Sequence, residues 1–180
     1  MTMQRREFFA ILSVCAANAP SLFAMPDFAG YQPQALTQPE YHLLDALAET
    51  LLPADETGPG AHSAYVAYYL DVVLKHSVAA KVRFWKDGLA GVEALGQKRF
   101  ERSFAACSGP EREEVMAELA NRESAPQNDL DHFFVEFKKT AIDAFYASIL
   151  IQREHLGYQG NTAVMEFAGC THVDFEHPGI

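Results

Sequence analysis

The sequence has few basic residues and few cysteines. Its 14 Lys and Arg stand against 24 Asp and Glu, which gives a formal net charge of -10, and there are 3 Cys in 180 residues. Nucleic acids and anionic lipid surfaces are bound by clustered Lys and Arg, so this charge balance argues against both as partners. The length suits one globular domain, which leaves little room for separate cofactor and substrate domains.

The familiar signatures of catalysis and cofactor binding are also missing. The sequence has no Cys-x-x-Cys-His for covalent haem, no Gly-x-x-x-x-Gly-Lys phosphate loop, no His-Glu-x-x-His and no Gly-x-Ser-x-Gly. A dinucleotide site needs a glycine-rich turn between a strand and a helix, whereas Gly58-Pro59-Gly60 lies between two predicted helices. We therefore expect no catalytic, cofactor-binding or metal site in this chain.

What the chain does have begins with a distinctive N-terminal segment. Arg5 and Arg6 precede Phe8 and Phe9, and no charged residue occurs from Phe8 to residue 24. This order resembles a twin-arginine export signal, and the apolar run is too short to span a bilayer. We expect residues 1–24 to direct export to the periplasm and to be removed there. A core-docked N-terminal helix is the alternative.

Helical periodicity accounts for the middle of the chain. Apolar residues recur at helical spacing, and no strand alternation competes with them. The sequence predicts an all-α fold, a compact bundle of about five helices with an irregular C-terminal arm. Its parts are an extended lead-in over 25–38, a helical domain over 39–152 and the arm over 153–180. The predicted helices cover about 39–52, 61–75 and 78–95, a short stretch after residue 108, and a last long helix to about residue 150.

Single residues predict helix boundaries and packing. Thr37 lies where a helix should start, and Ser108 is followed by a glutamate at the capping-box spacing. Trp85 belongs to an apolar stripe that we expect in the core, and Gly88 on the same helix suggests close contact with a neighbouring helix. Asp71 is spaced for an ion pair with the lysine four residues later.

The C-terminal arm holds the residues with the most potential as ligands. Cys170, His172 and His177 are of the types that bind zinc, but their spacing matches no standard site, and solvated tail residues are the simpler interpretation. In an oxidising compartment Cys107 and Cys170 could bond to each other, remain free, or, for Cys170, form a disulfide across an interface. The sequence leaves these alternatives open.

The same arm predicts a surface for a partner. It has no periodic core face of its own, so its aromatic side chains need another surface to bury against. We predict a partner interface that includes Tyr158, Phe167, Cys170 and Phe175.

Several stretches resemble the gluconate 2-dehydrogenase subunit 3 family over most of residues 37–172. The most specific is Leu-Pro-Ala-Asp at 52–55 followed by Gly-Pro-Gly-Ala at 58–61, and Gly-Tyr-Gln-Gly-Asn at 157–161 supports it. The resemblance implies a small non-catalytic subunit that pairs with, stabilises and escorts a large FAD-dependent gluconate or sugar dehydrogenase of the glucose-methanol-choline oxidoreductase type. A cytochrome c subunit with haem c often accompanies such complexes, which are membrane-associated on the periplasmic side.

Two other function classes make different predictions. An autonomous exported helical module would bind a metal or small ligand through the Cys/His residues of the arm. A self-contained enzyme would have to use Asp55, Glu56, His62 or His172, and the sequence supplies no paired geometry for that chemistry.

Overall fold

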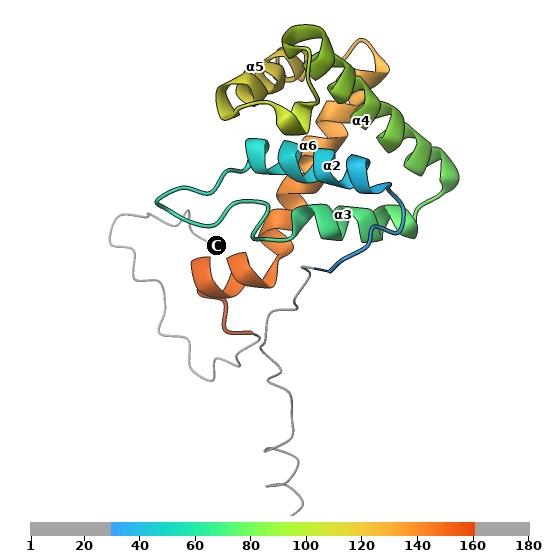
Figure 1. Ribbon diagram of the computed structural model, residues 1–180. Helices are drawn as coiled ribbons and strands as arrows, with labels where there is room; N and C mark the ends of the chain where they lie inside the picture. Colours follow the sequence, from blue (N-terminus) through green and yellow to red (C-terminus); the bar gives the residue numbers. More distant parts are fainter. Residues whose placement is uncertain (1–29, 161–180) are drawn as a thin grey trace, which may run out of the picture. The chain divides into compact units, whose positions relative to one another are not determined.

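The computed structural model describes residues 30–160, and its helices lie in one unit that begins at Pro33. Figure 1 shows the arrangement. In chain order the elements are α2 (Gln38–Leu51), α3 (Val66–Lys75), α4 (Ala79–Phe100), the 3-10 turn η1 (Phe104–Ala106), α5 (Gly109–Ala120), α6 (Asp129–Ala147) and the π-helical turn η2 (Ile151–His155). Within the described range there are five α-helices and no strand, which confirms the predicted all-α bundle.

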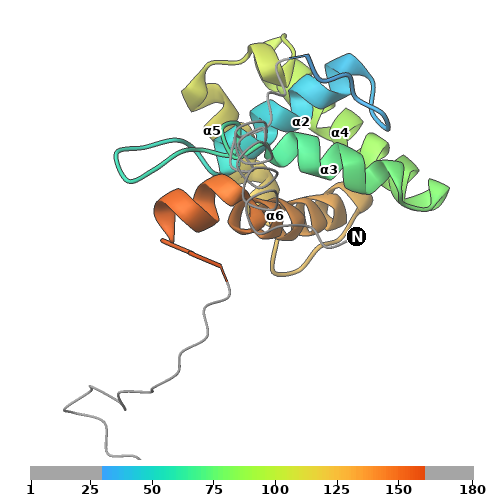
Figure 2. The same cartoon turned by 90° about the horizontal axis from the view of Figure 1, so that it is seen from below.

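The core lies where α6 meets α4 and α3. In Figure 2 α6 and α3 lie side by side, and α6 packs on α4 and α5 as well. Trp85 is only 1% exposed, and its ring meets the Phe133 ring edge-on, with the centroids 5.6 Å apart. Phe137 stacks on Phe133 at 6.0 Å. Such aromatic pairs contribute about 0.5–1.5 kcal/mol each beyond the area they bury, so this cluster fixes α6 against α4.

Glycine allows the close approach of α4 and α6. A Cβ placed on Gly88 would overlap the Phe133 ring, and one on Gly91 would come within 2.8 Å of a Leu130 methyl carbon. The expected close contact at the α4 glycines is therefore confirmed. The helix gives up about 1 kcal/mol of intrinsic propensity at each glycine in exchange for this packing.

Helix starts follow the predicted capping chemistry. The Glu40 carboxylate accepts the Thr37 N–H at 2.7 Å in front of α2, and Glu111 accepts the Ser108 N–H at 2.7 Å in front of α5. Each glutamate thereby satisfies a backbone donor that the helix itself leaves without a partner. The hydrogen bonds that Glu111 accepts from Ser108, first from the backbone N–H and then from the hydroxyl at 2.9 Å, lower the pKa of Glu111.

The second helix is shorter than its sequence pattern predicts. The pattern indicated a start near residue 61, but α3 begins at Val66. The Ala61 N–H donates to the Leu52 carbonyl at 2.8 Å, which ties this stretch to the end of α2. Tyr65 then takes a left-handed backbone conformation, with φ 57°, which cannot continue a right-handed helix. The apolar residues before Val66 therefore form turns.

Asp71 joins the lead-in to the bundle. Its spacing indicated an ion pair with Lys75, but the structure buries this side chain completely. The carboxylate accepts the backbone N–H groups of Gln34, Ala35 and Leu36 at 2.7, 3.1 and 2.9 Å. A buried carboxylate is costly unless it is hydrogen-bonded, and these three donors provide that compensation. Residues 34–36 are thereby fixed against α3.

Two helix ends differ from the predicted bounds. α4 continues through Gly96 to Phe100 instead of ending near 95, and it ends where Glu101 adopts φ 55°. The last long helix ends at Ala147 instead of near 150, since Ser148 takes an extended conformation. The Ser148 hydroxyl accepts the Ile151 N–H at 3.3 Å, and η2 follows. Part of the segment predicted as an irregular arm is thus a π-helical turn.

Candidate functional site

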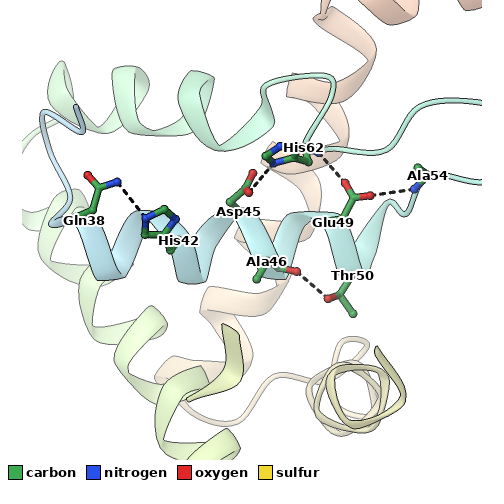
Figure 3. Close-up of polar contacts among 8 residues, drawn as sticks. All are labelled: Gln38, His42, Asp45, Ala46, Glu49, Thr50, Ala54 and His62. Atoms are coloured by element: carbon green, nitrogen blue, oxygen red, sulfur yellow. Dashed lines mark hydrogen bonds and ion pairs between the residues drawn. The ribbon is translucent and has the colours of Figure 1, made fainter. Parts of the chain in front are cut away.

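The loop between α2 and α3, residues 52–65, has its conformation set by carboxylates on α2. Glu49 accepts the Ala54 N–H at 3.1 Å and the His62 N–H at 2.7 Å, so one side chain holds both arms of the loop. Figure 3 shows these two hydrogen bonds of Glu49 together with Asp45, whose carboxylate lies 2.7 Å from Nδ1 of His62. Glycine at position 60 leaves room for the Glu49 carboxylate, which a Cβ at that position would overlap.

The tip of this loop is a closed turn that packs on η2. One Asp55 carboxylate oxygen accepts the Thr57 hydroxyl at 2.6 Å, the Thr57 N–H at 2.7 Å and the Gly58 N–H at 3.1 Å. These bonds, the hydroxyl bond first, lower the pKa of Asp55. Gly58 lies against the His155 imidazole so closely that a Cβ would overlap the ring. Asp55 therefore acts as a turn former, as Asx residues commonly do.

A groove of about 360 Å³ opens between the loop and the end of α6. We call it the η2 groove. Its walls are mostly apolar, and its polar lining residues are Asp55, Thr57 and His155. The remaining lining residues are Leu51, Leu52, Pro53, Gly58, Pro59, Phe145, Tyr146, Ile151 and Leu156. Because Glu49 fixes one wall and the buried Ile151 anchors the other, the groove is preformed.

Exposed apolar side chains gather beside this groove. In residues 30–160 six large hydrophobic side chains are exposed, and four of them belong to the end of α6 and the segment after it. They are Tyr146, Ile149, Leu156 and Tyr158, with exposed fractions of 53%, 55%, 61% and 49%. The other two, Tyr69 and Val78, belong to α3 and the link to α4. An apolar concentration of this kind commonly marks a contact surface.

Sequence reasoning named only Tyr158 from this surface. That residue is exposed directly after η2, and its N–H donates to the Gln152 carbonyl at 2.7 Å, which turns the chain back over η2. Tyr146, Ile149 and Leu156 were missed. The sequence held a sign of their exposure, because Tyr146 and Ile149 do not belong to the inward-facing apolar stripe of the last helix, although they neighbour Phe145 and Leu150. The other predicted interface residues, Phe167, Cys170 and Phe175, lie outside the described residues.

The residues considered for catalysis do not converge. Asp55 is bound within its own turn, and His62 pairs with Asp45 on α2 with its side chain 72% exposed. No reactive geometry joins these two groups in the described part of the chain. His172, proposed for the same chemistry, and the signal residues Arg5, Arg6, Phe8 and Phe9 lie outside it.

The described residues provide neither a cluster of metal ligands nor a reactive thiol. Between residues 30 and 160 no three His, Cys, Asp or Glu side chains are placed to hold a metal ion. Cys107 is a free thiol and only 3% exposed, and burial raises its pKa. A buried thiol of raised pKa has little of the thiolate that reacts or binds metals. The arm residues Cys170, His172 and His177 lie beyond the described range.

No helix within the described residues is both long and apolar enough to cross a bilayer.

Comparison with known proteins identifies the family of the chain. The family model of gluconate 2-dehydrogenase subunit 3 matches residues 38–162, well over half of the 180 residues. The match includes the loop, η2 and every residue that lines the η2 groove. No curated protein and no solved structure matches the chain significantly. The resemblance inferred from the Leu-Pro-Ala-Asp and Gly-Pro-Gly-Ala stretches is confirmed, and the chain belongs to the gluconate 2-dehydrogenase subunit 3 family.

Proposed function

We propose that this chain is the small, non-catalytic subunit of a periplasmic FAD-dependent dehydrogenase. It pairs with a large flavoprotein of the glucose-methanol-choline oxidoreductase type, which binds FAD and oxidises gluconate or a related sugar. The chain stabilises that subunit and carries it through twin-arginine export. A third subunit with haem c takes up the electrons and holds the complex at the membrane.

The family match carries this proposal, because the family is named as a subunit of gluconate 2-dehydrogenase. The exposed side chains beside the η2 groove add support, since a subunit that works inside a complex needs an apolar contact surface. The order of Arg5, Arg6, Phe8 and Phe9 supports the export role.

Such a subunit acts by binding, because the free energy of its association stabilises the folded flavoprotein. An obligate interface commonly buries more than about 2,000 Å². A partner that binds only the folded flavoprotein stabilises it by about 2.7 kcal/mol when present at 100 times its dissociation constant. Substrate oxidation and electron transfer take place on the other subunits.

A pull-down tests the proposal. The full chain with a C-terminal affinity tag is expressed in its native host and purified from periplasmic and membrane fractions. We expect a large partner in one-to-one ratio and a flavin absorbance spectrum in the eluate. The matched control replaces Arg5 and Arg6 by Lys, which should keep both proteins out of the periplasm. A colourless monomer would contradict the proposal and direct attention to metal analysis of the arm.

A further inference from the structure

The η2 groove has the size to receive one or two large side chains. Its volume of about 360 Å³ lies at the lower end of the range typical of ligand pockets. Aromatic and long aliphatic side chains that fill preformed pockets at the centre of an interface provide most of the binding free energy in many complexes. Tyr146 and Leu156 line the groove and are also exposed, so they would pack around an inserted side chain.

The charges near the groove favour a basic occupant. Segments 51–59 and 145–158 carry three acids, Asp55, Glu56 and Glu154, against one base, Arg153. With His neutral the net charge of these segments is 1 - 3 = -2. The pKa of Asp55 is lowered by its turn, so this carboxylate remains charged under mildly acidic conditions. Basic side chains around an inserted apolar group would therefore be attracted to this rim.

The same charges disfavour two other occupants. Residues 161–180 follow the groove-lining segment in the sequence but contain three acids and no Lys or Arg, so they would bring like charge to an acidic rim. A second copy of the chain would bring a further net charge of -10. Like-charge juxtaposition of this kind opposes both contacts. The family match adds a second argument, because it includes the whole lining of the groove but ends at residue 162.

We propose that the η2 groove is the docking site for the dehydrogenase subunit, and that it receives an aromatic or long aliphatic side chain flanked by Lys or Arg. This inference rests on the proposed function, which supplies the partner. It goes further because it assigns the contact to residues that the structure describes and states the chemistry of the partner segment that they receive. The prediction from the sequence placed the contact on the arm, whose residues His155, Leu156 and Tyr158 belong to this surface, while Phe167, Cys170 and Phe175 lie outside the described residues.

A photo-crosslinking experiment identifies the occupant. A benzoylphenylalanine is introduced in place of Leu156 in the tagged full chain, and in place of Tyr69 as a control with a comparably exposed side chain on α3. We expect irradiation to join the Leu156 variant to the flavoprotein subunit, while the Tyr69 variant gives little of that product. A product of twice the mass of the chain, or an internal crosslink to residues 161–180, would overturn the proposal.

Affinity measurements test the chemistry of the occupant. Leu156→Ser should weaken binding of the purified flavoprotein at least about tenfold, as expected for a pocket contact, whereas Val78→Ser, at an even more exposed apolar position, should not. Glu56→Lys should weaken binding severalfold at low salt and less at high salt. Glu113→Lys on α5 makes the same charge change at an exposed position that does not line the groove, and it is the control. Equal effects of the paired variants would overturn the proposal.

These results separate the two proposals. If the wild-type chain co-purifies with a flavoprotein but Leu156→Ser binds it as tightly as Val78→Ser does, the groove assignment fails and the proposed function stands. If the wild-type chain brings down no flavoprotein, both fail. Circular dichroism of each variant establishes that a loss of binding is not a loss of fold.

Discussion

Replacing Asp71 by Asn should destabilise the bundle through a single mismatched hydrogen bond. The native carboxylate accepts three backbone N–H groups, with one oxygen facing Gln34 and the other facing Ala35 and Leu36. The Asn carbonyl oxygen can keep the second pair, but its NH₂ group then faces the Gln34 N–H. A hydrogen bond to a charged group contributes about 1.5–3 kcal/mol, so we expect a loss of about 2–3 kcal/mol.

The loss is measured by urea unfolding followed by circular dichroism. A change of about 2 kcal/mol corresponds to a fall in Tm of roughly 5–10 °C for a domain of this size. Asp87→Asn, at an exposed position on α4, is the matched control and should change stability by less than about 0.5 kcal/mol. Hydrogen exchange at residues 34–36 should accelerate in the Asp71 variant. A loss below about 0.5 kcal/mol for Asp71→Asn would refute this account of how the lead-in is held.

Three further predictions concern packing and titration. Gly88→Ala gains about 1 kcal/mol of helix propensity, but its Cβ overlaps the Phe133 ring, which costs about 1–3 kcal/mol. Urea unfolding should therefore show a net destabilisation of up to about 2 kcal/mol, and a gain in stability would show that α4 and α6 can separate freely. Burial, with the nearby Asp45 and Asp71 carboxylates, raises the pKa of Tyr41 to about 12 from the ordinary value of 10.0. The folded state holds this proton more tightly, so stability should fall as the pH rises from 10 to 12, and Tyr41→Phe should flatten that slope. In a chain whose other cysteines are Ser, Cys107 should react with a thiol reagent only after unfolding, and rapid labelling of the native protein would contradict its burial.

Local chemistry in the sequence predicted the parts of the fold that depend on near neighbours. The capping residues before α2 and α5, the Trp85 stripe and the tight packing at Gly88 all follow from spacings of a few residues. Such features need no knowledge of the tertiary arrangement, because the interacting groups lie within one or two helical turns or on one face of a helix.

The features that escaped prediction depend on contacts between distant residues. Residues 61–65 have a helical pattern, but Glu49 and the Leu52 carbonyl hold them in turns. Asp71 matches a helical ion pair by spacing, yet its partners are backbone groups 35 to 37 residues earlier. The η2 groove combines a loop with a π-helical turn almost a hundred residues away. No local pattern brings such segments together, although the family resemblance did point to the loop.

If this chain escorts and stabilises a flavoprotein subunit, that subunit should reach the periplasm in active form only when the two are co-expressed. The flavoprotein that co-purifies with the chain is produced alone, with the wild-type chain, and with the Arg5→Lys/Arg6→Lys variant. Its amount and its dye-linked dehydrogenase activity are then measured in the periplasm. Active flavoprotein is expected there only with the wild-type chain. Equal periplasmic activity in all three strains would rule out an escort role for this chain.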